Sequence, residues 1–254
     1  VEPKALWALA LADQRCRDVV RPRLQALATL RLPPFRKSVQ SILCTVYDCF
    51  NKGLGDTGVQ ALAAIIAGGH TAHVEWLDLG TNSIGDPGVQ ALAPALRHLP
   101  RLEMIFLSNN SIGEAGAIAL ADAAADGALP RLQHLSLDRN RIGDSGVQAL
   151  AAAVAGGALA RLEKLNLNGN GVGDAGAEAL AAACASAATL PKLEELLLGA
   201  NEIGDAGMRA LAAAITGGGL AALREVYVGN PGSWQGNPAS GEPVQAALRQ
   251  RKQS

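Results

Sequence analysis

The chain has 254 residues, of which 49% are hydrophobic, 18% are charged and only 3% are aromatic. This composition excludes a disordered or collagen-like chain and predicts a core built from small apolar side chains. Because 22 basic residues stand against 23 acidic ones, the formal net charge is -1, and no overall field attracts the chain to nucleic acid or to an acidic membrane surface.

Residues 1–40 are expected to form an N-terminal helical cap. Two stretches, at about 4–18 and 23–31, carry Leu at helical spacing, and prolines interrupt them. This segment holds 8 Lys or Arg against 3 Asp or Glu, whereas residues 41–248 hold 11 against 20. The basic cap is therefore a candidate for a second contact with an acidic surface, although a solvated capping helix explains the same residues.

The middle of the chain repeats one template. Five segments share a strand-like L-x-x-L-x-L pattern, an Asn three residues later, and then a stretch close to I-G-D-x-G-x-x-A-L. The anchor position is occupied in turn by Asn82, Asn110, Asn140, Asn170 and Asn201. Weaker copies at 44–62 and 223–231 carry Lys52 and Pro231 there, so residues 41–232 are expected to form about seven units.

Each unit predicts a short strand, a turn and a helix. The Asp of the second half, which is Glu114 in one unit, is placed to cap free N–H groups of a helix, and Pro87 suits a first helical position. Gly pairs at 68–69, 156–157 and 217–218 are expected near the C-terminal ends of three helices. The Asn side chains are expected to satisfy interior backbone groups that the turns leave unpaired.

The unit also dictates the overall shape. Strands stack about 4.8 Å apart and packed helices about 8–10 Å apart, so a stack of such units must curve. We expect an α/β solenoid, or horseshoe, with parallel strands on the concave face and helices on the convex face. Residues 233–254 are expected to close it with a loop and a capping helix from Pro243 to about Arg251.

The repeated pattern resembles the leucine-rich repeat, in particular the ribonuclease-inhibitor-like class that also occurs in NOD-like receptors and Ran GTPase-activating proteins. The resemblance covers about residues 44–231. It implies the solenoid fold but no particular partner, because repeats of this class serve many unrelated ones. Two alternative functions stay open: a GTPase-activating regulator of a small GTPase, or a sensor fragment of a NOD-like receptor. The GTPase-activating family usually has an acidic tail, whereas this chain has Arg249, Arg251 and Lys252 there.

Few residues suggest catalysis. His70 and His73 have a metal-binding spacing but fall in a loop without a nearby Cys. His134, Ser136 and Asp138 stand side by side on one expected strand, which is not the arrangement of a nucleophile, a base and an orienting group. We therefore expect no enzymatic activity, no metal and no cofactor.

The strand positions that face the concave side carry the most informative residues. Four of the eight aromatic residues, Phe50, Trp76, Phe106 and Tyr227, fall at such positions. Trp76, Met104 and Phe106 are expected to touch as one apolar patch, followed by a polar middle, and such a patch indicates a protein-binding site. The alternative is that the aromatic residues pack against the N-terminal cap or stiffen the sheet.

We therefore predict a protein-interaction scaffold or adaptor, either free or as a subunit of a larger assembly, with a protein partner on the concave face. The expected contact residues are Phe50, Trp76, Asp78, Met104, Phe106, His134, Ser136, Lys164, Asn166, Leu197 and Tyr227. The four cysteines form no C-x-x-C pair and indicate a reducing, intracellular compartment, with the cytoplasm favoured. No segment is long and apolar enough to span a bilayer, and an organelle stays an alternative if a targeting peptide preceded Val1.

Overall fold

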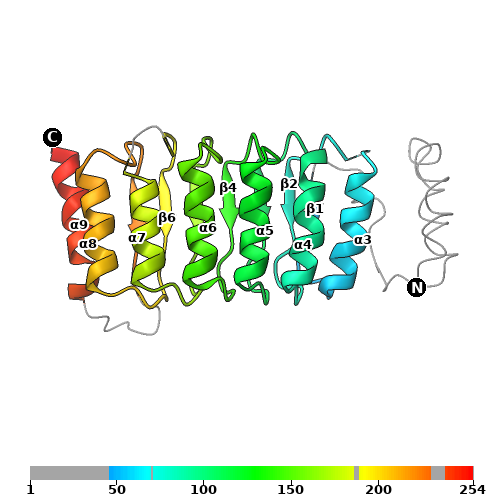
Figure 1. The fold of residues 1–254 in the computed structure, drawn as a ribbon, viewed down its shortest axis with the longest axis horizontal. Coiled ribbons are helices and arrows are strands. Elements are labelled where there is room, and N and C mark those ends of the chain that lie inside the picture. The colour runs from blue at the N-terminus through cyan, green and yellow to red at the C-terminus, as the bar shows by residue number, and fades with distance from the viewer. Residues whose placement is uncertain (1–45, 70, 186–188, 230–237, 254) are drawn as a thin grey trace, which may run out of the picture.

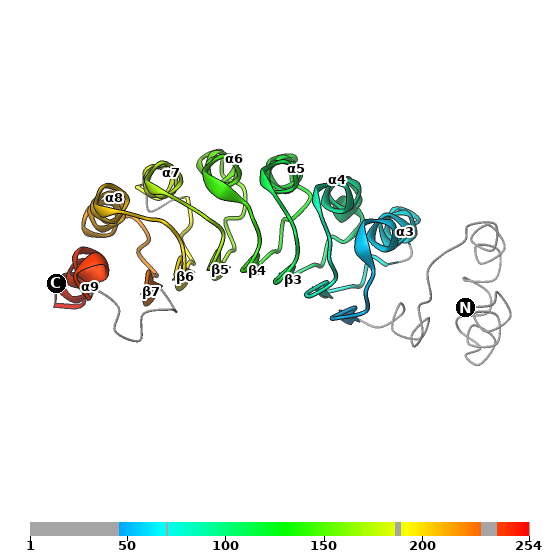
Figure 2. The ribbon, with the colours of Figure 1, turned by 90° about the horizontal axis from the view of Figure 1, so that it is seen from below.

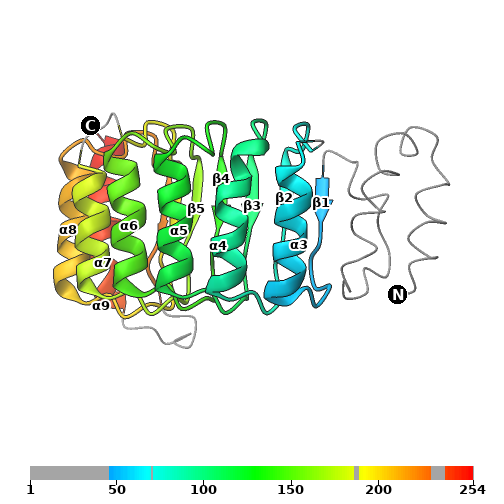
Figure 3. The same ribbon diagram turned by 45° about the vertical axis from the view of Figure 1, so that its right-hand side comes forward.

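The fold is seen in a computed structural model that describes residues 46–69, 71–185, 189–229 and 238–253. Within these ranges seven parallel strands form one sheet, and each strand pairs with the next one along the chain (Figures 1 and 3). The strands are β1 (Val46–Asp48), β2 (Trp76–Asp78), β3 (Met104–Phe106), β4 (His134–Ser136), β5 (Lys164–Asn166), β6 (Glu195–Leu197) and β7 (Glu225–Tyr227). The N-terminal cap expected at 1–40 lies outside the described residues.

One helix follows each strand. The helices are α3 (Gly55–Ala67), α4 (Asp86–Ala95) with the 3-10 turn η2 (Leu96–His98), α5 (Glu114–Ala125), α6 (Gly143–Ala155), α7 (Asp174–Ala183), α8 (Asp205–Thr216) and α9 (Pro238–Gln253). Figure 2 shows α3 to α8 along the outer side of an arc and the strands along its inner side. The predicted α/β solenoid is therefore confirmed. None of the described helices has the length and apolar character needed to cross a membrane.

The core follows from the register of the strands. The middle residue of every strand pairs with the middle residue of its neighbours, so Leu77, Ile105, Leu135, Leu165 and Leu196 form one continuous buried row. On the helix side the row meets Leu and many buried Ala residues. Alanine lets helices approach the sheet closely, which explains how a chain with few aromatic residues still fills its interior.

The anchor asparagines hold neighbouring units together, as predicted. Asn140 donates from Nδ2 to the carbonyl oxygens of Leu107 and Leu137, at 2.9 Å each, and its Oδ1 accepts from the N–H of Ile112 at 3.1 Å. Asn82, Asn110, Asn170 and Asn201 make equivalent bonds one unit apart. Each anchor therefore satisfies backbone groups of its own unit and of the unit before it.

The acidic residues also cap helices, but in the next unit rather than in their own. Asp56 Oδ1 accepts hydrogen bonds from the N–H groups of Gly85, at 2.7 Å, and Gly88, at 3.1 Å, which lie at the start of α4. Asp86, Asp144 and Asp174 cap α5, α7 and α8 in the same way. A cap expected to act within one helix is thus a link between successive units.

Glu114 interrupts this series. The N–H of Gly143 donates to the carbonyl oxygen of Asn170 at 3.0 Å, and that of Gly146 to Ile142 at 3.3 Å, instead of to the Glu114 carboxylate. Gly143 adopts a positive φ of 61° and becomes the first residue of α6, whereas the glycines capped by Asp lie in extended conformation before their helices. Glu114 is one methylene longer than the capping Asp residues, and the helix of the next unit, α6, starts differently from the helices that Asp caps.

The last helix closes the carboxyl end of the stack. It begins at Pro238, five residues earlier than the expected Pro243, so the proline that starts the helix is a different one. Val244 is fully buried against the preceding unit. Gln245 donates to the carbonyl oxygen of Val226 at 2.9 Å, and Arg251 donates to the carbonyl oxygens of Leu220 and Leu223. Side chains of α9 thus satisfy backbone groups at the end of the repeat stack.

Candidate protein-binding face

The strands line the inner side of the arc (Figure 2). Because they pair in register without a shift, the outer two residues of each strand form two rows across the sheet. The first row is Trp76, Met104, His134, Lys164, Glu195 and Glu225, and the second is Asp78, Phe106, Ser136, Asn166, Leu197 and Tyr227. Ten of the eleven residues predicted as partner contacts lie in these rows, and Phe50 follows β1. Helices α3 to α8 lie on the other side of the sheet. We call this surface the strand face.

An aromatic pair stands near the amino-terminal end of the strand face. The side chain of Trp76 is 39% exposed, and its ring lies 5.6 Å from that of Phe106 between centroids, with the ring planes tilted by 48°. Met104 pairs with Trp76 in the strand register, and both Met104 and Phe106 are half-buried. The three residues form the aromatic patch of the strand face, with Trp76 as its most exposed member.

Phe50 and Tyr227 are also exposed, but each has a packing role. The Phe50 ring lies 3.0 Å from the position that a Cβ atom on Gly80 would occupy, and Gly80 is buried. The Tyr227 ring lies over Gly199 in the same manner, at 2.2 Å from the position that a Cβ atom on Gly199 would occupy. Part of the aromatic pattern therefore reflects rings that cover glycines of neighbouring strands, so these two aromatics have a structural as well as a candidate binding role.

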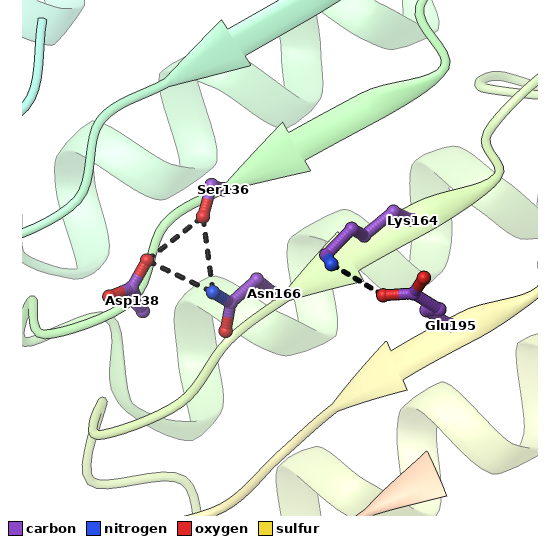
Figure 4. Close-up of polar contacts among 5 residues, drawn as sticks. All are labelled: Ser136, Asp138, Lys164, Asn166 and Glu195. Carbon is purple, nitrogen blue, oxygen red and sulfur yellow. Dashed lines mark hydrogen bonds and ion pairs between the residues drawn. The ribbon is translucent and has the colours of Figure 1, made fainter. Parts of the chain in front are cut away.

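A polar cluster follows the aromatic patch along the arc (Figure 4). Asp138 Oδ1 accepts hydrogen bonds from Ser108 Oγ at 2.6 Å, Ser136 Oγ at 2.9 Å and Asn166 Nδ2 at 3.1 Å. Ser136, which was expected to contact a partner, is only 8% exposed because it lies inside this cluster. His134 takes no part in it, so the three residues do not form a hydrolytic triad.

Sequence reasoning missed Asp138 and Ser108 as part of the candidate site. Asp138 stands two residues after the predicted contact residue Ser136, and Ser108 stands two residues after the predicted contact residue Phe106. The alternation of strand side chains brings all four to the same face. The polar pattern Ser136-Leu137-Asp138 was the available signal. It places the carboxylate on the strand face but does not reveal which donors converge on it.

Two ion pairs lie at the far half of the sheet, one within the strand face and one between residues that precede β6 and β7. Lys164 pairs with Glu195 across β5 and β6, and each side chain is 39% exposed (Figure 4). Arg224 lies 3.4 Å from Glu194, measured between nitrogen and oxygen. The charge of Lys164, a predicted contact residue, is therefore already matched by a neighbouring strand.

The described residues offer little for catalysis. They contain no group of three or more His, Cys, Asp or Glu side chains that could hold a metal ion, and His70 lies outside them. Burial raises the pKa of the Cys184 thiol from 9.0 to about 12, so this thiol stays protonated at neutral pH and is a poor nucleophile. Cys49 is also buried.

Comparison with known proteins agrees with the repeat geometry. A family model described as Leucine Rich repeat matches residues 70–93, 129–151, 161–181 and 189–212, each of which spans a strand and at least the first part of the following helix. The chain is a leucine-rich-repeat protein. The ribonuclease-inhibitor-like subclass stays a prediction. No curated protein matches the sequence.

Among solved structures, the leucine-rich-repeat chain is similar to one described as the crystal structure of a TLR13–ssRNA13 complex. The two sequences are 17% identical, and the TM-score is 0.31. The match covers 68% of this chain and 30% of that chain, so the leucine-rich-repeat chain spans less than a third of its length.

Proposed function

We propose that this leucine-rich-repeat protein is a non-catalytic interaction scaffold or adaptor that binds a protein partner on its strand face. Stacked repeats generally offer an extended concave surface on which other proteins bind. The observation that carries the proposal is the aromatic patch, in which Trp76 is 39% exposed and contacts Phe106 on the face opposite helices α3 to α8.

The distribution of exposed apolar side chains supports the strand face over the helix face. Among the described residues, the large hydrophobic side chains that are exposed are Phe50, Trp76, Ile118 and Tyr227. Ile118 lies in α5 and stands alone on the helix side, whereas the other three belong to the strands or follow them. Single exposed apolar residues are ordinary, but an aromatic pair supplies a contact of the kind that dominates binding energy.

The size of the patch suits a binding hot spot. An apolar side chain of a partner that covers Trp76 and Phe106 would bury on the order of 100 Å² of apolar surface, which is worth about 2–3 kcal/mol at about 25 cal/mol per Å². Hot-spot residues contribute about 2 kcal/mol or more when truncated. Loss of the patch should therefore weaken binding by a factor of about 30–150.

Affinity capture from the native source tests the proposal, with the intact chain and a Trp76→Ser/Phe106→Ser variant compared by quantitative mass spectrometry. Ile118→Ser is the matched control, since Ile118 is 38% exposed and lies away from the strand face. Partners that the double variant loses and the control keeps are the expected result. If both variants retain every partner of the intact chain while circular dichroism shows folded protein, the strand face is not the binding surface.

The compartment belongs to the same proposal. Cys184 is a free thiol and is buried, as thiols are in a reducing environment. We therefore place the scaffold inside the cell, in the cytoplasm. Localisation of a tagged chain by microscopy would test this, and a chain found outside the cell would contradict it.

A further inference from the structure

We infer that the partner presents a basic segment, in which a bulky apolar side chain and a Lys or Arg stand two residues apart. The inference rests on the proposed function, because it describes what the strand face recognises. The apolar residue would cover the aromatic patch, and the cation would bind the carboxylate of Asp138.

The strand face is acidic. Between β2 and β7, the two rows and the positions two residues after each strand, which continue the second row, hold four carboxylates and one cation. The carboxylates belong to Asp78, Asp138, Glu195 and Glu225. The cation, Lys164, is already in an ion pair with Glu195. A basic partner therefore complements this face, whereas an acidic one is repelled.

Asp138 is the carboxylate best prepared for a cation. Its Oδ1 accepts three hydrogen bonds, and all three donors, Ser108, Ser136 and Asn166, are neutral. These bonds fix the orientation of the carboxylate but leave its charge without a counterion from the cluster. A side chain held in place before binding loses little entropy when a cation arrives, and the bond that forms is charge-assisted.

The spacing of the two features sets the spacing in the partner. Phe106 pairs in register with Ser136, and Asp138 stands two residues further along the same chain. One strand spacing of about 4.8 Å and two residue rises of about 3.3 Å place the two positions about 8 Å apart. In an extended peptide, side chains two residues apart lie on one side at about 6.6 Å, and the length of Lys or Arg covers the difference.

Selection from a random peptide library displayed on phage tests the inference with the full chain as bait. We expect selected peptides to carry an apolar residue two positions from a Lys or Arg. Synthetic copies of these peptides, labelled for fluorescence anisotropy, are the probes for affinity. Asp138→Asn keeps the oxygen that accepts the three hydrogen bonds and removes only the charge, so it should weaken probe binding about tenfold.

The controls separate this inference from the proposed function. Glu178→Gln removes a charge from the exposed side of α7 and should leave probe affinity unchanged. Peptides that require Trp76 but lack a basic residue, or that bind Asp138→Asn as tightly as the intact chain, would overturn the inference alone. If no selected peptide depends on Trp76, the proposed function fails as well.

The basic N-terminal segment of the chain itself is the competing occupant. It carries Phe35, Arg36 and Lys37, which also combine an apolar residue with cations. Arg36→Glu/Lys37→Glu in the full chain should leave probe affinity within about twofold. A gain of more than tenfold would show that this segment normally covers the strand face, and would overturn a separate partner as the occupant.

Discussion

Replacing Glu114 by Asp should stabilise the protein, because it would complete the series of caps that link successive units. In the four units where Asp56, Asp86, Asp144 or Asp174 stands at this position, one carboxylate oxygen accepts hydrogen bonds from two N–H groups at the start of the next helix, as Asp144 does from Gly173 and Gly176 at 2.7 and 2.9 Å. Glu114 makes neither bond, and α6 begins at Gly143 instead.

The size of the stability gain depends on the hydrogen bonds that the N–H groups of Gly143 and Gly146 already make. Gly143 and Gly146 already donate to neutral carbonyl oxygens, at 3.0 and 3.3 Å, so no donor is left unsatisfied. The substitution exchanges two neutral hydrogen bonds for two charge-assisted ones, which are roughly twice as strong. Caps of this kind contribute about 1 kcal/mol. We expect a gain of about 1 kcal/mol, which raises the melting temperature by about 2–4 °C for a chain of this size.

Urea unfolding followed by circular dichroism measures this gain, and amide hydrogen exchange at Gly143 and Gly146 locates it. Asp144→Glu is the reciprocal change and should lose about 1 kcal/mol. Asp205→Glu is the neutral control, because Asp205 accepts no hydrogen bond within the described part of the chain. If Glu114→Asp and Asp144→Glu shift the unfolding midpoint no more than Asp205→Glu does, the link between carboxylate length and helix start is wrong.

Three further predictions concern single residues. Ala200 has a φ of 56°, so Ala200→Gly should stabilise by about 1 kcal/mol in urea unfolding, whereas Ala152→Gly on the exposed side of α6 should destabilise by about 1 kcal/mol. Asn140→Ala should cost about 3 kcal/mol, because it removes partners from two buried carbonyl oxygens and one N–H. In a variant whose other three cysteines are Ser, Cys184 should resist alkylation in the folded chain up to about pH 9. It should react once the chain is unfolded. Because its pKa rises from 9.0 to about 12 on folding, its contribution to stability is full below pH 9 and is lost as the pH rises towards 12.

The fold could be predicted because each unit repeats the same packing residues. Once five units align, the spacing of the anchor asparagines fixes where every strand and helix must begin, and a single misread residue cannot shift the pattern. The capping partner was missed for a physical reason. Sequence rules for helix caps consider residues within a few positions, but Gly85 lies 29 residues after Asp56 and becomes its neighbour only when the units stack.

The strand face was predictable as a set of positions but not as a set of interactions. Alternation along a strand shows that Ser136 and Asp138 face the same side, yet it does not show that Ser136 is buried by the cluster that holds the carboxylate. The same limit applies to Lys164, whose match with Glu195 depends on the length and direction of both side chains. Contacts across strands 30 residues apart in sequence require the register, which the structure supplies.

The contrast between the two kinds of position explains where function resides in this chain. The Leu, Asn and Asp of the template are constrained by packing and by bonds to neighbouring units, so they must be nearly the same in every unit. Positions such as Trp76, Met104 and His134, which form one row across three strands, carry no such constraint and differ between most units. Side chains that vary on an otherwise uniform scaffold are free to be chosen for a partner, and here that choice joins an aromatic patch to an acidic surface.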